Sequence, residues 1–201
     1  DAIRTSANNL LGIINDILDF SKIDAGKMEL VEAEYVINSI IYDVQNIIST
    51  RIGGRDAAFI VDIDPYIPGV LLGDELRIKQ ILLNLLGNAV KFTVRGKIAL
   101  NVGFEKTSED TITLTFDVID TGIGIKEEDQ EKLFSEFTQV DTKKNRSIQG
   151  TGLGLVISKR LANLMGGDVK LKSRYGSGTT FTVTIVQRVV DYTPAFSLDR
   201  T

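Results

Sequence analysis

The 201-residue chain contains no cysteine and no histidine. Without cysteine there is no disulfide, no thiolate nucleophile and no cysteine-ligated metal, and without histidine there is no imidazole base or imidazole metal ligand. No apolar run approaches the roughly 20 residues that span a bilayer. The sequence has neither a signal peptide nor an initiator methionine, so we interpret it as a piece of a longer protein and expect it to lie in the cytoplasm, whether or not that parent is anchored in a membrane.

An excess of positive charge is also missing. Lysine and arginine number 23 against 27 aspartates and glutamates, which gives a net charge of −4. We therefore expect no contact with nucleic acid or with an anionic membrane surface. The apolar fraction of 43% and the charged fraction of 25% are ordinary for a globular protein, and the length suffices for one domain with an additional element.

Apolar periodicity predicts a mixture of helices and strands. Residues 1–22 have heptad-like spacing, which is typical of a bundle helix, although a helix lying on a globular core gives a similar pattern. Further helices are predicted at residues 37–48, 74–92, 127–137 and 154–165. Strands are predicted at residues 28–36, 59–63, 97–104, 111–119, 168–173 and 179–186. Residues 138–149 are polar and cationic and indicate a loop, and residues 188–201 indicate a tail or linker.

Two glycine runs carry the clearest functional signal. The first, at residues 120–125, ends a strand with Asp120, and the second, at residues 150–155, opens a helix. Glycine exposes its N–H without a side chain, and the free N–H groups at a helix start favour a phosphate. Neither run is followed by the lysine of a P-loop. An aspartate before glycine is also a common turn residue, but the two runs together predict a nucleotide pocket of another kind.

The predicted helix at residues 74–92 has one polar face. Spacings of three and four residues place Arg77, Gln80, Asn84, Asn88 and Lys91 on it. Any surface helix has a polar face, yet asparagine is a poor residue for a helix interior. Amide oxygens one turn apart suit Mg²⁺ or phosphate-bound water, and the lysine supplies a positive charge.

Five segments, taken in order, resemble the N, G1, F, G2 and G3 boxes of bacterial sensor histidine kinases, members of the GHKL ATPase superfamily with the Bergerat fold. They are residues 84–93, 120–124, 134–137, 150–155 and 176–181. Residues 10–28 resemble the second helix of that family's dimerisation and phosphoacceptor hairpin. The resemblance implies an α+β fold, a two-layer α/β sandwich with a mixed, mostly antiparallel sheet, preceded by one long amphipathic helix.

The resemblance also implies a division of the chain. Residues 1–26 would be the partial hairpin, residues 27–187 the ATP-binding catalytic domain with a lid at 138–149, and residues 188–201 a tail or linker.

At the phosphate end, the resemblance implies that Asn88 coordinates the Mg²⁺ bound with ATP and that Asn84 supports the phosphate and water network. The phosphate contacts that it implies are Lys91, Lys143, Lys144 and Arg146, and Gly150, Gly152 and Gly154 would close the lid onto the phosphates. Phe92 would pack near the nucleotide, and Thr151 and Leu153 complete the implied ATP-binding set.

At the adenine end, Asp120 would accept a hydrogen bond from adenine N6. Gly122 and Gly124 would shape the pocket, and the Thr180 hydroxyl would support Asp120.

Hydrolysing relatives have a glutamate base where this sequence has Asn84, which cannot deprotonate water. The resemblance therefore favours a histidine kinase over an ATPase; the alternatives are a regulatory pseudokinase that only binds nucleotide, or another GHKL ATPase. Because the chain lacks histidine, we expect the acceptor on an upstream hairpin helix and expect no autophosphorylation of this chain alone. Reading residues 1–6 as an altered acceptor box is disfavoured by their closeness to residues 14–23. The implied partners are that helix, a response regulator or fused receiver domain, and a second copy of the parent.

Overall fold

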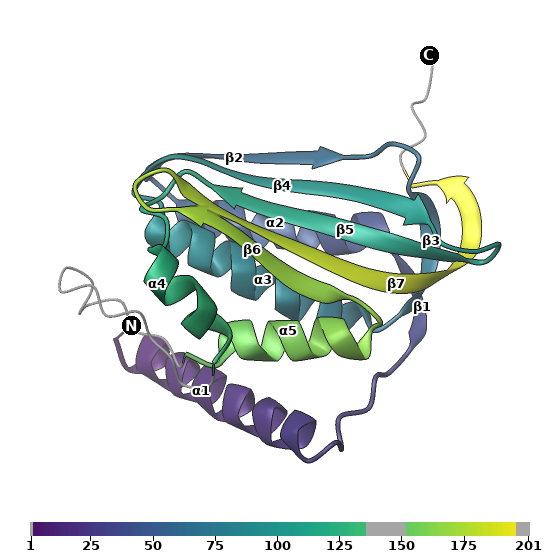
Figure 1. Cartoon of the computed structure of the whole chain (residues 1–201), viewed down its shortest axis with the longest axis horizontal. Helices are drawn as coiled ribbons and strands as arrows, with labels where there is room; N and C mark the ends of the chain where they lie inside the picture. Colours follow the sequence, from purple (N-terminus) through teal and green to yellow (C-terminus); the bar gives the residue numbers. More distant parts are fainter. Residues whose placement is uncertain (1, 136–151, 196–201) are drawn as a thin grey trace.

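Three helices form one layer of the molecule and a seven-stranded sheet forms the other (Figure 1). The computed structural model describes residues 2–135 and 152–195. The elements are α1 (Ala2–Asp24), β1 (Ala33–Val36), α2 (Ile37–Ile52), β2 (Asp56–Ile63), β3 (Pro68–Gly73), α3 (Glu75–Phe92), β4 (Arg95–Lys106), β5 (Thr111–Asp120), α4 (Glu127–Gln130), the 3₁₀ helix η1 (Glu131–Phe134), α5 (Gly154–Leu164), β6 (Asp168–Arg174) and β7 (Gly178–Pro194). We call the described residues 33–135 and 152–195, without α1, the sandwich.

The strand order is β1-β3-β7-β5-β4-β2, with β6 also paired to β7. Every pair is antiparallel except β2 with β4. The predicted mixed, mostly antiparallel sheet is therefore confirmed. β7 is long because it pairs with β6 along its first half and with β3 along its second half.

Alternating side chains of the strands build the core against the helices. Every second residue of β5, from Ile112 to Asp120, is buried, and the residues between them are only partly covered. Helices α2 and α3 contribute fully buried isoleucines and leucines such as Ile40 and Leu85. Burial of one such side chain stabilises the fold by roughly 1.5–3 kcal/mol. Asp120 is thus a polar residue at the end of an otherwise apolar row.

Two predicted boundaries are wrong. No strand was predicted between residues 63 and 74, where Pro65 and Pro68 indicate a loop. Instead, β3 pairs with β1 and β7, and Pro68 is tolerated as the first residue of the strand. Residues 188–194 were expected to be a linker, but they continue β7 and pair with β3. The end of β7 is exposed on both faces, so it lacks the apolar alternation that identifies a strand. The predicted strand at residues 28–36 is confirmed only from Ala33 onward.

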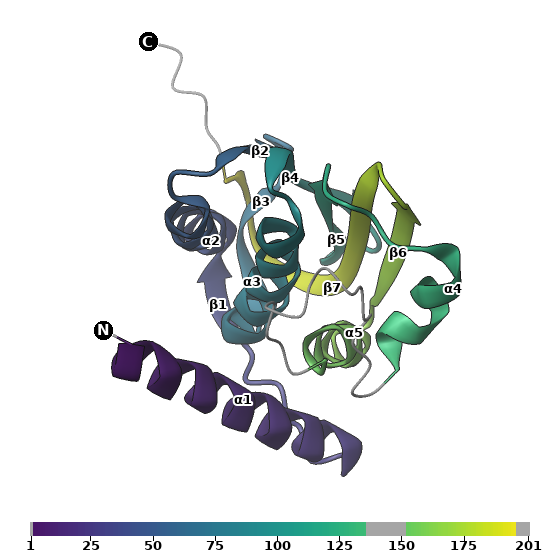
Figure 2. The ribbon, with the colours of Figure 1, turned by 90° about the vertical axis from the view of Figure 1, so that its left-hand side faces the viewer.

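Helix α1 lies beside the sandwich near α3 and α5 (Figure 2). Among the α1 side chains that the structure describes, most large apolar ones are exposed, and only Phe20 and Ile23 pack against the core. This exposure favours the bundle-helix interpretation over that of a helix resting on a globular core. Within the described residues, no helix is long and apolar enough to cross a bilayer.

Candidate nucleotide site

The adenine end of the predicted site centres on Asp120, the last residue of β5. Its side chain is buried, with 7% of the residue exposed, and accepts a hydrogen bond from the Gly122 N–H at 2.8 Å. Burial raises the pKa of Asp120, while hydrogen bonds from the backbone of Gly122 and Thr179 and the hydroxyl of Thr93 act in the opposite direction. Burial is the larger effect, so the ionised carboxylate lacks part of the stabilisation that a donor from a ligand would supply.

Thr93 immediately follows α3 and is 1% exposed. Although its hydroxyl favours the ionised form of Asp120, its Oγ1 has no hydrogen bond of normal geometry within the described part of the chain. A buried hydroxyl that lacks such a partner costs free energy unless a ligand or water satisfies it. Asp120 and Thr93 together therefore form a polar site suited to a ligand that both donates and accepts hydrogen bonds.

The prediction that Thr180 supports Asp120 is wrong by one residue. Thr179 is the register partner of Asp120 in the antiparallel pair of β5 and β7. Successive side chains of a strand point to opposite faces. Thr179 therefore faces the helices with Asp120, whereas Thr180 pairs with Ile119 on the other face. Thr179 could have been identified from the sequence by applying the two-residue period of a β-strand to the two threonines after Gly178.

The glycines of the first run allow close backbone packing. A Cβ on Gly122 would lie 2.5 Å from the carbonyl oxygen of Phe92, at the end of α3. Gly124 adopts a φ of +65° and lies against the backbone of Arg174. Only glycine fits both positions, so the loop after β5 is held against the end of α3. This contact brings Asp120 close to the end of the helix that carries the predicted phosphate ligands.

The phosphate end is built where α3 meets α5. Asp74 caps α3 by accepting from the Arg77 N–H at 3.1 Å. About two turns beyond Arg77 along the helix, Asn84 Nδ2 donates to Ser158 Oγ of α5 at 2.9 Å. Gly154 begins α5 directly against the Asn84 side chain, where a Cβ would overlap the amide. Ser158 was not predicted as a site residue, because no sequence motif or spacing distinguishes a buried serine within an apolar helix.

Asn88 and Lys91 follow Asn84 on the same helix. Burial lowers the pKa of Lys91, whose Nζ lies 5.1 Å from the centre of the Phe92 ring. A nearby anion such as a phosphate would stabilise the charged form of this partly buried ammonium group. A cavity of about 320 Å³ opens beside Asn84, and its walls come from four helices: Asp16, Arg51, Gln80, Leu83, Asn84, Gly154 and Ile157.

Among residues 2–135 and 152–195, no group of three or more acidic, histidine or cysteine side chains could hold a metal ion. A hard cation at Asn88 would therefore draw most of its oxygen ligands from phosphates and water. This donor set fits an ion that binds with a nucleotide rather than one resident in the protein.

The second glycine run is described only in part. Gly152 has a φ of +73°, and Leu153, 1% exposed, precedes the first turn of α5. The whole of the predicted lid lies outside the described residues, as do the remaining predicted ATP-binding residues: Lys143, Lys144, Arg146, Gly150 and Thr151.

Comparison with known proteins agrees with this geometry. Residues 73–189 match the family model described as "Histidine kinase-, DNA gyrase B-, and HSP90-like ATPase". The chain is 46% identical over 198 residues to hybrid signal transduction histidine kinase B of Dictyostelium discoideum, covering 98% of the chain and 10% of that protein. It is 41% identical over 181 residues to the signal transduction histidine-protein kinase BarA of Escherichia coli K12, covering 90% of the chain and 20% of that protein.

Among solved structures, full-length ShkA in complex with AMPPNP superposes with a TM-score of 0.78 at 31% identity, over 94% of the chain and 38% of ShkA. The chain thus spans between a tenth and about two fifths of the length of these three proteins. These matches confirm the predicted fold and family.

Proposed function

Because the chain belongs to the histidine kinase-, DNA gyrase B- and HSP90-like ATPase family, we propose that it is the ATP-binding catalytic part of a two-component histidine kinase. The observation that carries this proposal is the meeting of α3 with the loop after β5. The close approach of Gly122 to Phe92 sets the buried Asp120 beside the end of a helix bearing Asn84, Asn88 and Lys91.

At the adenine end, the ionised carboxylate of Asp120 accepts a hydrogen bond from the exocyclic amine of adenine. The buried Thr93 hydroxyl gains a partner from the base or from a bound water. Because the carboxylate is shielded from solvent, its bond to the amine is stronger than it would be in water. Gly122 and Gly124 let the loop lie close to the base.

At the phosphate end, Lys91 neutralises phosphate charge, and the N-terminus of α5 at Gly152, Leu153 and Gly154 offers backbone N–H groups. The Asn88 amide oxygen would be a protein ligand of Mg²⁺. When bound, that ion neutralises charge on the phosphate oxygens. The chain's contribution is to hold the phosphates at a fixed distance from the adenine end along α3.

In the proposed reaction, an imidazole nitrogen of a histidine on the upstream hairpin helix attacks the γ-phosphorus of ATP. The N–P bond forms as the bond from the γ-phosphorus to the β–γ bridging oxygen breaks, and its electron pair leaves with ADP. Such transfer depends on positioning and charge stabilisation rather than on a protein base. Asn84 suits this role, because its amino group already donates to Ser158 and its amide cannot remove a proton from water.

The partners follow from the same proposal. The exposed apolar residues of α1 pack into a hairpin bundle with the upstream helix and with a second copy of the parent. A response regulator or fused receiver domain takes the phosphoryl group from the histidine, and the assembly operates in the cytoplasm. No described feature favours the pseudokinase or the hydrolysing ATPase over this proposal.

Transfer to a supplied acceptor tests the proposal. The chain is incubated with radiolabelled Mg·ATP and a separate hairpin domain that carries the histidine. We expect acid-labile phosphate on the hairpin and none on the chain itself. ATP binding without any transfer would support the pseudokinase, and release of inorganic phosphate without transfer would support an ATPase. The control, Asn88→Ala, is expected to transfer far less.

A further inference from the structure

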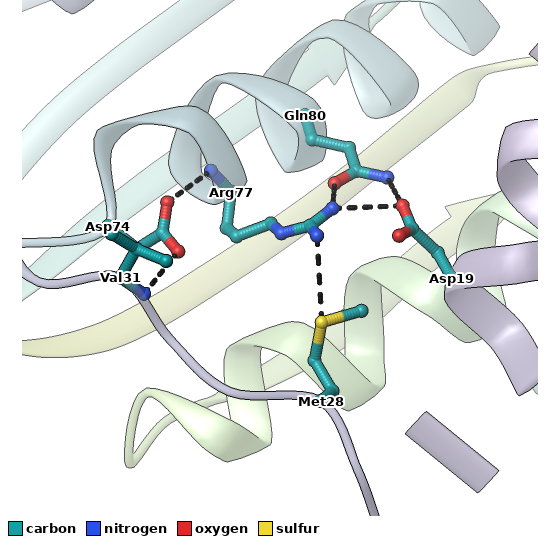
Figure 3. Close-up of polar contacts among 6 residues, drawn as sticks. All are labelled: Asp19, Met28, Val31, Asp74, Arg77 and Gln80. Atoms are coloured by element: carbon teal, nitrogen blue, oxygen red, sulfur yellow. Dashed lines mark hydrogen bonds and ion pairs between the residues drawn. The ribbon is translucent and has the colours of Figure 1, made fainter. Parts of the chain in front are cut away.

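Asp19 of α1 is held by two side chains of α3 (Figure 3). Its Oδ2 accepts from Arg77 Nη1 at 2.9 Å and from Gln80 Nε2 at 2.8 Å. Arg77 Nη1 also donates to Gln80 Oε1 at 2.7 Å. The side chains of Arg77 and Asp19 are only 18% and 14% exposed, so water screens this ion pair less than a surface pair. We call Asp19, Arg77 and Gln80 the latch.

The segment that joins α1 to the sandwich is fastened at the same place. Arg77 Nη2 lies 3.6 Å from Met28 Sδ, and the N-cap residue Asp74 accepts from the Val31 N–H at 2.9 Å (Figure 3). The latch, the connecting segment and the first turn of α3 therefore form one continuous polar network.

A second contact fixes the last turns of α1 to α5. Arg160 Nη1 pairs with Asp24 Oδ1 at 3.1 Å, and its guanidinium lies 4.8 Å from the centre of the Phe20 ring.

Little apolar surface supports this attachment. Phe20 and Ile23 pack against the core, whereas six other large apolar residues of α1 are 42–58% exposed: Leu10, Leu11, Ile13, Ile14, Ile17 and Leu18. The attachment of α1 therefore depends mainly on polar contacts, which water can replace at modest cost. The attachment of α1 can therefore be released, and it leaves the exposed apolar residues of α1 free to pack in a helix bundle.

The latch holds α1 over the phosphate end of the site. Asp16 of α1 forms one wall of the 320 Å³ cavity, and Asn84 of α3 and Gly154 of α5 lie on the other side. In this position α1 lines the cavity through Asp16, and α1 itself has no histidine. Transfer requires the acceptor nitrogen at about 3–3.5 Å from the reacting phosphorus. The latched arrangement therefore differs from the one in which transfer takes place.

We propose that the latch is an autoinhibitory contact, which holds α1 over the phosphate end and opens before a histidine from the other hairpin helix reaches ATP. The inhibitory role rests on the proposed function, whereas the holding of α1 by the latch does not. Arg77 and Gln80 thus lie on the same face of α3 as Asn84 and Asn88, but they bind Asp19 of α1 instead of the nucleotide.

The holding role can be measured as a distance in the chain itself. The chain has no cysteine, so spin labels on Asn15→Cys in α1 and Lys170→Cys in β6, both exposed positions, are unique. We expect one narrow distance population. Asp19→Asn should shift the docking equilibrium about tenfold toward longer, broader distances, since removal of an ionised acceptor of two hydrogen bonds is of the order of 1.4 kcal/mol.

Two further variants make that measurement decisive. The exchanged pair Asp19→Arg with Arg77→Asp should restore the narrow population that each single change loses. Asp43→Asn is the matched control, because it removes an ion pair that α3 makes through Lys79 with α2 instead of α1, and it should leave the distances unchanged. An unaltered distribution in Asp19→Asn would overturn the latch.

The inhibitory role is measured by transfer from Mg·ATP to the separately supplied hairpin. Asp19→Asn should raise kcat/KM for the hairpin about tenfold, with the Kd for ATP unchanged, and the exchanged pair should return it to the starting rate. A fall or no change in rate, with the distances lengthened, would overturn inhibition. Absence of transfer from every variant would overturn the proposed function and the inhibitory role with it, while the distances still decide whether the latch holds α1.

Discussion

Asp120 combines burial with a proposed function that requires its charge. Burial raises its pKa, so the free protein binds a proton at this site at a higher pH than the unfolded chain does. The stability linked to that proton is complete at pH values below the unfolded pKa and is lost as the pH rises through the folded pKa. At neutral pH the carboxylate therefore opposes folding, while in the proposed function it is the acceptor for the adenine amine.

Replacement of Asp120 by asparagine separates the two effects. Asp120→Asn should weaken Mg·ATP binding roughly 10- to 100-fold, because an ionised acceptor of a buried hydrogen bond contributes roughly 1.5–3 kcal/mol. The difference in the free energy of unfolding, wild type minus variant, should decrease as the pH rises from acid to neutral. Calorimetric titration and urea unfolding at two pH values measure these quantities. Unchanged ATP affinity would show that the residue is only a turn residue.

The pH dependence of binding gives a second check on the same carboxylate. Protonation of Asp120 removes the acceptor, so ATP affinity should decrease as the pH falls through its raised pKa. The decrease should begin at a higher pH than an ordinary aspartate would give. Asp120→Asn should lose this dependence, and a decrease of equal size in the variant would assign it to another group.

Between elements, the meeting of α3 and α5 depends on Gly154. Gly154→Ala would push a methyl group into the Asn84 amide, so we expect a loss of roughly 1–3 kcal/mol in stability and weaker ATP binding. The matched control is Gly12→Ala in α1, where a Cβ has no neighbour within 4 Å and where alanine is the better helix residue. Thermal unfolding and ATP titration of both variants test this, and equal behaviour would contradict it.

The end of β7 makes a prediction about the domain boundary. A chain that stops at residue 187 loses the part of β7 that pairs with β3, which then keeps only β1 as a partner. It also loses the hydrogen bonds of Ala195 with Ile67 and Asn38. Several hydrogen bonds at roughly 0.5–1.5 kcal/mol each make a loss of at least about 2 kcal/mol the expected result. Urea unfolding of chains that end at residues 187 and 195 compares them. Equal stability would restore the linker interpretation of residues 188–194.

These elements also show what a sequence can predict. α3 and β5 were predicted closely, because each has one buried face with a regular period. β3 and the end of β7 were missed because their identity comes from pairing with each other, which no local pattern records. Several of the predicted site residues lie on α3 and at the end of β5. Thr93 and Ser158 were not among those predicted because their contacts are between elements, and Thr179 differs from Thr180 only in the face of the sheet that it occupies.

At the scale of the whole molecule, α3 contacts three other parts of the chain. Its first turns hold α1 through the latch, its middle contacts α5 through Asn84, and its end meets the loop that carries Asp120. From Arg77 to Lys91 this face extends about 21 Å at 1.5 Å per residue. One rigid helix thereby fixes the distance between the adenine end of the site and the attached α1.

The most direct test of the account is calorimetric titration of the chain with Mg·ATP and, separately, with Mg·GTP. We predict one site for ATP, with GTP bound at least about tenfold more weakly, because guanine presents a carbonyl where adenine presents its amine and leaves the buried Asp120 without a donor. Equal affinity for the two nucleotides, or no binding of either, would contradict the assignment of this pocket.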